Sequence, residues 1–350
     1  MKPQLESLGV YKAGLSEEAL KRKFNVEGEF SRLASNENPI GPSPQVYEAI
    51  RSQDALNYYP DPEAIQLKAS LSEFYQVDSE QILVGAGLDE IIMMISRARL
   101  NPKGHILTSD GTFIQYTTHA LIEDNEVVSI PLKEGKFDLE GFKDKMNDET
   151  SIIWICNPNN PTGTYVTETE LTGFLESVHE DVMVVLDEAY FEFVLREDYP
   201  DGVALLKRFP NLIVLRTFSK AYGLAGLRVG YAITSKAYID VFNKVKLPFN
   251  VTALSLVGAI AALKDQQYLK DYVAHNDKER NKFFEADYKE HLIDSVTNFI
   301  FVKTNQPEAL FEALIKGGVI ARPMPNGVRI SIGTRDDNEK VHKVINSFFS

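Results

Sequence analysis

Short, nearly all-apolar runs that alternate with helical patterns place the strongest constraint on the fold of this chain. The runs cover residues 82–84, 105–108, 127–130, 151–156, 182–186, 211–215 and 228–233. Continuous apolarity is typical of strands that are buried on both faces, and helices between strands are typical of parallel sheets. We therefore predict an α/β fold with a large domain whose mostly parallel sheet is flanked by helices.

A chain of 350 residues is too long for a single compact core, so we expect more than one domain. The segments outside the large domain predict an N-terminal arm and a smaller C-terminal domain. From about residue 254 an apolar helix, a long charged helix (265–290), two strands and two more helices follow, which indicates a smaller α+β C-terminal domain. We predict an N-terminal arm over 1–40, a large domain over 41–250 and a small domain over 251–350. Ser43 before Pro44 and Asp61 before Pro62 each predict a capped helix start.

Composition excludes several classes of function. The net charge of −13 argues against a nucleic-acid or anionic-membrane surface, and no apolar run approaches the length of a membrane span. The N-terminus lacks the apolar core of a signal peptide, so we expect a cytoplasmic protein. Cys156 is the only cysteine and the histidines show no ligand spacing, so we predict neither a disulfide nor a metal site.

Polar and glycine-rich segments follow the strands predicted for the large domain. They are GAGLDE (85–90), GTFIQY (111–116), NPNNPTG (157–163), DEAY (187–190) and RTFSKAYGLAGLR (216–228). Open parallel sheets bind ligands at the carboxyl ends of their strands, so we expect these segments to meet in one crevice.

Lys220 follows a buried strand and has Thr217, Ser219 and Arg228 nearby in sequence. A lysine that forms a Schiff base needs its amine beside an aldehyde, and hydroxyl groups with an arginine suit a phosphate. A surface lysine in a polar loop is the alternative interpretation, and taken alone it is the commoner case. The neighbouring segments favour the cofactor site.

Asp187 stands at the mouth of a buried strand, where an unpaired carboxylate is costly, so a cationic partner is expected. A protonated pyridine nitrogen would supply that charge and make the ring an electron sink. Tyr190 and Asn160 are placed to reach the phenolic oxygen of such a cofactor. A helix cap with a buried tyrosine, and a simple turn, are the alternatives for these segments.

Two further segments suit the same ligand. The backbone N–H groups of Gly87, Leu88 and Asp89 open a helix and are candidates to bind phosphate. Phe113 is a candidate to stack on a flat ring, although packing is the more common role of an aromatic residue in a loop.

The motifs NPTG, D-x-A-Y and S-K-x-x-G-L-x-G-x-R-x-G resemble those of the class I/II aminotransferases, enzymes of fold type I that depend on pyridoxal 5′-phosphate (PLP). The resemblance extends over essentially the whole chain. It implies that Lys220 carries the cofactor, that Asp187 pairs with its ring nitrogen, and that Phe113 stacks on the ring. It assigns the phenolic oxygen to Tyr190 and Asn160, and the phosphate to Thr217, Ser219, Arg228 and the turn of Gly87, Leu88 and Asp89.

Within that family, LASNENPIGPSP (33–44), YYPD (58–61) and DEAYFEF (187–193) are most similar to the histidinol-phosphate aminotransferases. This resemblance implies transamination of L-histidinol phosphate with 2-oxoglutarate in histidine biosynthesis. It assigns Arg329, Arg322, Tyr11 and Asn160 to the substrate. It also implies a homodimer with shared active sites, in which Tyr59 reaches the cofactor phosphate of the partner subunit. An aromatic amino-acid aminotransferase and a PLP-dependent phosphoamino-acid decarboxylase remain as alternatives.

Overall fold

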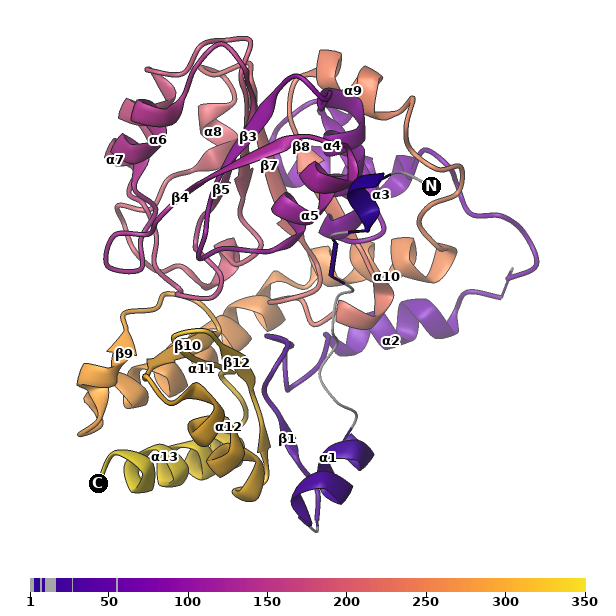
Figure 1. Ribbon diagram of the computed structural model, residues 1–350. Helices are drawn as coiled ribbons and strands as arrows, with labels where there is room; N and C mark the ends of the chain where they lie inside the picture. Colours follow the sequence, from indigo (N-terminus) through magenta and orange to yellow (C-terminus); the bar gives the residue numbers. More distant parts are fainter. Residues whose placement is uncertain (1–2, 7, 10–16, 27, 55) are drawn as a thin grey trace.

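We describe the protein from a computed structural model, which places residues 3–6, 8–9, 17–26, 28–54 and 56–350. A large α/β domain forms the upper part of the molecule in Figure 1, and a smaller domain with its own sheet forms the lower part. Each domain has its own cluster of buried apolar side chains.

The large domain is built on a seven-stranded sheet with strand order β2-β8-β7-β6-β5-β3-β4. Its strands are β2 (Ile82–Gly85), β3 (His105–Ser109), β4 (Glu126–Ile130), β5 (Thr150–Cys156), β6 (Met183–Asp187), β7 (Leu212–Thr217) and β8 (Gly230–Ile233). Neighbouring strands are parallel, except that β8 runs antiparallel to β2 and β7. The predicted, mostly parallel sheet is confirmed.

The reversed direction of β8 brings a long loop to the functional edge of the sheet. Thr217 at the end of β7 pairs with Gly230 at the start of β8, so the chain between them turns at the carboxyl ends of the parallel strands. Lys220 and Arg228 both lie in this loop. A parallel β8 would instead have required a crossover to the opposite edge.

Helices cover both faces of the sheet, with α4, α5 and α9 on one side and α6, α7 and α8 on the other (Figure 1). These helices are α4 (Leu88–Arg99), α5 (Gln115–Ile122), α6 (Leu139–Lys145), α7 (Glu168–Leu175), α8 (Gly202–Leu205) and α9 (Lys236–Phe242). Both layers bury the central strands, whereas β4, at one edge of the sheet, is half-exposed. The expectation that every apolar run is buried on both faces is therefore wrong for β4.

One of the two predicted helix starts is confirmed. Ser43 caps α2 (Pro44–Arg51) by accepting a hydrogen bond from the backbone N–H of Gln45. The start predicted at Pro62 is wrong, because α3 (Ile65–Tyr75) begins three residues later, after Ala64 adopts a left-handed φ of +50°. The Asp61 carboxylate still accepts the N–H of Ile65, at 2.7 Å.

The small domain contains a four-stranded antiparallel sheet of order β12-β13-β10-β9 with two helices packed on it. Its elements are β9 (Leu292–Ile293), β10 (Phe299–Lys303), α12 (Pro307–Lys316), β11 (Val319–Ile320), β12 (Arg322–Met324), β13 (Gly327–Ser331) and α13 (Arg335–Phe349). The long helix α11 (Gln266–Glu285) connects the two domains.

Two segments pack across the boundaries expected from the sequence. Near the N-terminus, β1 (Ser31–Arg32) pairs in parallel with β11, and α1 (Glu17–Phe24) packs against α12 of the small domain. Helix α10 (Ala253–Lys264), expected in the small domain, packs on α2 and α3 of the large domain. We propose that the structural boundary lies within α11, and the predicted division at residue 250 stays a prediction.

Candidate active site

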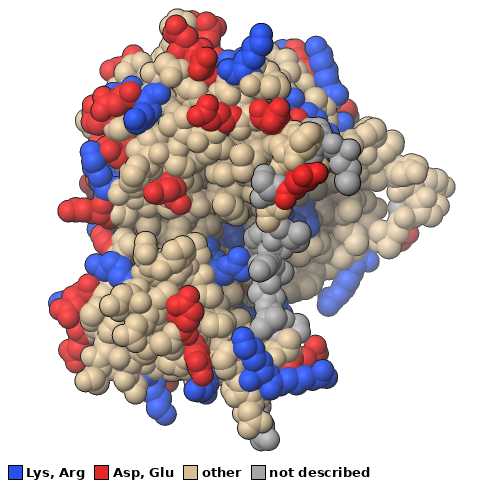
Figure 2. All heavy atoms as spheres, in the orientation of Figure 1, with Lys and Arg blue, Asp and Glu red and all other residues tan. Residues whose placement is uncertain are grey.

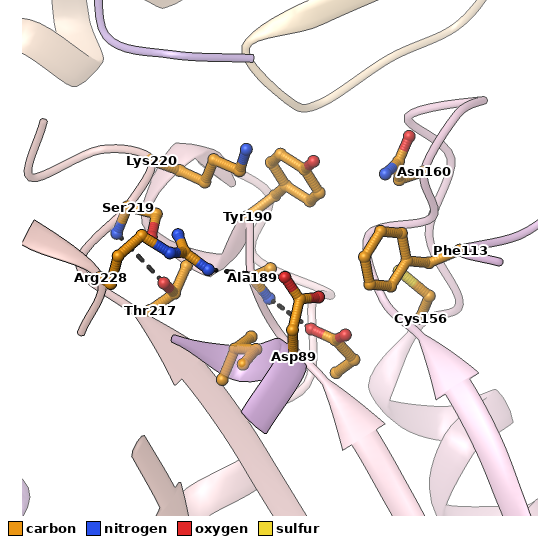
Figure 3. A pocket seen from close by; sticks show the side chains of 12 residues that line it. Asp89, Phe113, Cys156, Asn160, Ala189, Tyr190, Thr217, Ser219, Lys220 and Arg228 are labelled. Carbon is orange, nitrogen blue, oxygen red and sulfur yellow. Dashed lines mark hydrogen bonds and ion pairs between the residues drawn. The ribbon is translucent and has the colours of Figure 1, made fainter. Parts of the chain in front are cut away.

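A pocket of about 120 Å³ opens at the carboxyl edge of the seven-stranded sheet (Figure 3). Segments that follow β2, β3, β5, β6 and β7 line it, as expected from their polar sequences. The lining residues are Leu88, Asp89, Phe113, Cys156, Asn160, Asp187, Ala189, Tyr190, Thr217, Ser219, Lys220 and Arg228.

Lys220 projects from the β7–β8 loop, with its amine directed toward Tyr190 and across the pocket from Phe113 (Figure 3). The amine donates a hydrogen bond to the backbone oxygen of Ser35, at 2.8 Å. Burial lowers the pKa of Lys220 to about 8, and the positive charges of Arg329 and Arg228 act in the same direction. The lowered pKa increases the neutral fraction of the amine at neutral pH, and the neutral amine is the form that attacks a carbonyl group.

Asp187 is the last residue of β6, and its side chain is buried. One carboxylate oxygen accepts the Tyr116 hydroxyl at 2.6 Å, and the other accepts the backbone N–H of Ala189 at 3.0 Å. Burial raises the pKa of Asp187 to about 6, although both hydrogen bonds act to lower it. Among the residues that the structure describes, no lysine or arginine forms an ion pair with Asp187. The positive charge expected from the sequence beside Asp187 would therefore come from a bound ligand.

Tyr190 and Asn160 face the same pocket from the loops after β6 and β5 (Figure 3). The buried Tyr190 hydroxyl accepts a hydrogen bond from the Asn36 side-chain amide at 2.9 Å. Burial raises the pKa of Tyr190 to about 12, so the hydroxyl keeps its proton and remains a donor at neutral pH. The Asn160 side-chain oxygen accepts a hydrogen bond from the Arg329 guanidinium.

Thr217, Ser219 and Arg228 gather around the N-terminus of α4. The Thr217 hydroxyl accepts the backbone N–H of Ser219 at 3.1 Å, and Arg228 lies 3.4 Å from the Asp89 carboxylate. Gly87 immediately precedes the helix with a φ of +82°, and a β-carbon there would lie 2.5 Å from the Arg228 guanidinium. The positive φ favours glycine, and the absence of a side chain lets the guanidinium lie at the N-terminus of the helix, where guanidinium and helix together suit an anion.

A second cavity, of about 420 Å³, joins this pocket to the small domain. Arg322 and Arg329 are cross-strand partners in β12 and β13, so their short sequence separation brings both side chains to one cavity. Glu37 and Asn36 line the same cavity. Figure 2 shows a hollow between the domains with basic side chains inside it, while acidic residues are spread over the outer surface.

Tyr59, which the resemblance assigns to the cofactor phosphate of the partner subunit, is not among the residues that line this pocket. Tyr59 has 82% of its side chain exposed and stacks on Phe249, with ring centroids 4.6 Å apart. Tyr11 lies outside the residues that the structure describes.

The model of the family "Aminotransferase class I and II" matches residues 29–345, which includes every segment that forms the pocket. The chain is a class I/II aminotransferase.

Curated relatives of this aminotransferase carry a more specific name. The histidinol-phosphate aminotransferase of Macrococcus caseolyticus is 99% identical over 350 residues, covering 100% of both chains. That of Staphylococcus haemolyticus is 53% identical and covers 99% of both chains. Among solved structures, histidinol-phosphate aminotransferase from Sinorhizobium meliloti, in complex with PLP, has a TM-score of 0.90. It is 29% identical, and the match covers 99% of this chain and 98% of that one.

The aminotransferase is a PLP-dependent enzyme, and the residues of the pocket fit that cofactor. The Asp187 carboxylate is buried and forms no ion pair with any described lysine or arginine, which suits a protonated ring nitrogen. The Arg228 guanidinium, which the absence of a side chain at Gly87 lets approach the start of α4, suits a phosphate together with the N-terminus of that helix.

Several residues that contact the candidate site were not selected from the sequence, and three of them make hydrogen bonds to residues that were selected. Asn36 and Ser35 lie within the aminotransferase motif LASNENPIGPSP. They form hydrogen bonds with Tyr190 and Lys220, which are far from them in the sequence, so no local pattern indicated these contacts. Tyr116 belongs to GTFIQY, three residues after Phe113. Its place on the first turn of a helix that follows a strand of the sheet could have indicated a position near the pocket.

Proposed function

We propose that this aminotransferase transfers the amino group of L-histidinol phosphate to 2-oxoglutarate, giving imidazole-acetol phosphate and L-glutamate in histidine biosynthesis. The observation that carries the proposal is the position of Arg322 and Arg329 in a cavity continuous with Lys220. Histidinol phosphate bears a phosphate and glutamate bears carboxylates, and planar guanidinium groups bind both kinds of anion. The name shared by the full-length relatives supports the same substrate.

The residues of the inner pocket would hold PLP by its three polar ends. Bound PLP supplies an aldehyde that accepts the amino group and a ring that withdraws electrons from the reacting carbon. We assign the ring nitrogen to Asp187, the phenolic oxygen to Tyr190 and Asn160, and the ring face to Phe113. For the phosphate we propose Thr217, Ser219, Arg228 and the backbone of Gly87, Leu88 and Asp89.

Lys220 has two roles in this proposal. Its amine would hold the cofactor aldehyde covalently. Once free, its Nζ would take the proton from the substrate carbon that bears the amino group. A pKa near 8 suits this exchange, because the amine accepts and releases protons close to neutral pH.

Arg329 is the proposed anchor for the anionic group of each substrate. Its guanidinium already donates to the Asn160 side chain and to the backbone oxygen of Ala34, so its orientation is set before an anion binds. Arg322 is proposed as the second anion contact, and Tyr11 as a cover over the substrate.

A panel of amino donors tests the substrate assignment. Catalytic efficiency with histidinol phosphate is expected to exceed that with histidinol, tyrosine or phenylalanine by at least about tenfold, or about 1.4 kcal/mol. A buried phosphate–arginine contact readily supplies this difference. Equal or higher efficiency with phenylalanine would favour an aromatic aminotransferase, and release of carbon dioxide from a phosphoamino acid would favour a decarboxylase.

We propose that the enzyme works as a homodimer whose active sites are shared. The connection between α2 and α3 projects from the body at the right of Figure 1 and carries the exposed Tyr59. Large apolar side chains are exposed along the same region, and such patches mark protein interfaces. They are Ile40, Leu56, Tyr58, Ile65, Leu247 and Phe249.

A mixed dimer distinguishes a shared site from a local role of Tyr59. One protomer carries Lys220→Ala and its partner carries Tyr59→Ala. If Tyr59 acts in the partner's site, one of the two sites contains both intact residues, and activity at limiting PLP should recover to about half of the parent value. Absence of recovery, or a monomer in sedimentation at assay concentration, would contradict the shared site.

The single, buried Cys156 suits a reducing compartment, and we place the enzyme in the cytoplasm. Among the residues that the structure places, no helix has the length and apolarity needed to cross a lipid bilayer.

A further inference from the structure

Tyr116 reaches the candidate cofactor site by a hydrogen bond to Asp187. It lies on the first turn of α5 and is fully buried. Its hydroxyl donates a hydrogen bond of 2.6 Å to the Asp187 carboxylate. Tyr116 is absent from the residues that line the pocket, so it acts on a ligand through its neighbours, and its polar contact there is with Asp187.

Two aromatic neighbours hold the Tyr116 ring in one orientation. The ring stacks on Trp154 of β5 with centroids 4.7 Å apart and an interplanar angle of 10°. Phe113, at the wall of the pocket, packs on Tyr116 edge to face at 5.7 Å. Because the rings are interlocked, the hydroxyl has little freedom to turn away from Asp187.

The hydrogen bond from Tyr116 favours the charged form of Asp187. An ionised carboxylate only accepts hydrogen bonds, and a phenol held at its side satisfies one oxygen while the Ala189 N–H satisfies the other. Burial alone would raise the pKa of Asp187 further than the value of about 6 that results when these two donors oppose it. The other titratable groups that face Asp187 come from four segments, and they are Cys156, Asp89, Lys220 and Tyr190.

We propose that Tyr116 is a positioning residue, whose hydroxyl keeps Asp187 ionised and fixed in one orientation for the ring nitrogen of the cofactor. This inference rests on the assignment of Asp187 to that nitrogen. Without the Tyr116 hydroxyl, Asp187 gains a proton at a higher pH, and a neutral carboxyl pairs poorly with a protonated ring.

The test is the affinity for pyridoxamine 5′-phosphate, which carries the same ring and phosphate but forms no covalent link to Lys220. Full-length protein freed of cofactor is titrated between pH 5 and pH 9, for the parent and for Tyr116→Phe. Parent affinity is expected to fall below a midpoint near pH 6, where Asp187 gains its proton. In Tyr116→Phe this midpoint is expected to rise by about one pH unit, which corresponds to a tenfold change in proton affinity.

Two variants separate this role from simple packing. Trp154→Phe disturbs the same aromatic cluster but retains the hydroxyl, so its melting temperature should fall while its pH midpoint stays at the parent value. In an Asp187→Asn background, Tyr116→Phe should cause no further change in the pH profile, because the two residues act as one unit. Circular dichroism checks that each variant is folded.

The outcomes are distinct. If Tyr116→Phe keeps the parent midpoint while Asp187→Asn weakens binding, the role of Tyr116 is wrong and that of Asp187 stands. If Asp187→Asn binds as the parent does over the whole pH range, the assignment of Asp187 is wrong and the inference about Tyr116 falls with it.

Discussion

Lys220→Ala is expected to lower multiple-turnover transamination by at least about a hundredfold, because a positioned acid–base group contributes about 10²–10⁴-fold to a proton transfer. The variant should still bind PLP, since the carboxylate and phosphate contacts proposed for Asp187 and Arg228 remain. Steady-state assays with histidinol phosphate and 2-oxoglutarate measure the loss. Retention of more than a tenth of the parent rate would contradict the role of Lys220.

Chemical labelling locates the same lysine independently of activity. Borohydride reduction of the parent enzyme, followed by peptide mapping, is expected to place a pyridoxyl group on Lys220. Lys236→Ala is the matched control, because Lys236 is an exposed lysine paired with Asp240. That control should keep both the label and the activity, whereas a label on any other lysine would refute the assignment.

Asp187→Ala is expected to weaken cofactor binding by roughly one to two orders of magnitude, because a hydrogen bond to a charged group contributes about 1.5–3 kcal/mol. Proton abstraction should slow further, since the ring nitrogen loses the charge that keeps it protonated. Cofactor titration and single-turnover kinetics measure the two effects separately. Transamination at close to the parent rate would show that Asp187 has a different role.

The pH dependence of stability gives Asp187 a second signature, in protein freed of cofactor. Its folded-state pKa of about 6 lies above the ordinary value of 3.8, so the folded protein binds the proton more tightly than the unfolded chain does. The free energy of unfolding should therefore decrease as pH rises through this window, by about 3 kcal/mol from this group. In Asp187→Asn this contribution should disappear, and denaturant titrations at pH 4 and pH 7 measure the difference.

The sequence predicted the sheet and the convergence of its loops, because both depend on local patterns. A strand buried by helices on both faces needs an unbroken apolar run, and the runs that become β5, β6 and β7 are of this kind. Parallel strands then bring the residues after them to one edge. The positions of Asp187 and Asn160 at the pocket could therefore be predicted from the sequence, although their hydrogen-bond partners could not.

The hydrogen bonds between these site residues could not be predicted from local sequence patterns. Asn36 reaches Tyr190 across 154 residues of sequence, and Arg329 reaches Asn160 across 169. Such pairs depend on how the small domain docks on the large one, which hydrophobic periodicity does not encode. The start of α3 was missed for a local reason, because the left-handed backbone of Ala64 has no signature in an alanine side chain.

Residues 34–36 link the small domain to the proposed chemistry. They lie one residue after β1, which is paired to β11, and they contact Arg329, Lys220 and Tyr190 in turn. A rotation of the small domain would therefore alter three contacts of the active site together. A ligand that shifted this segment through Arg329 would also change the hydrogen bond of the Lys220 amine, and release of that amine would then change the affinity for the ligand by the same free energy.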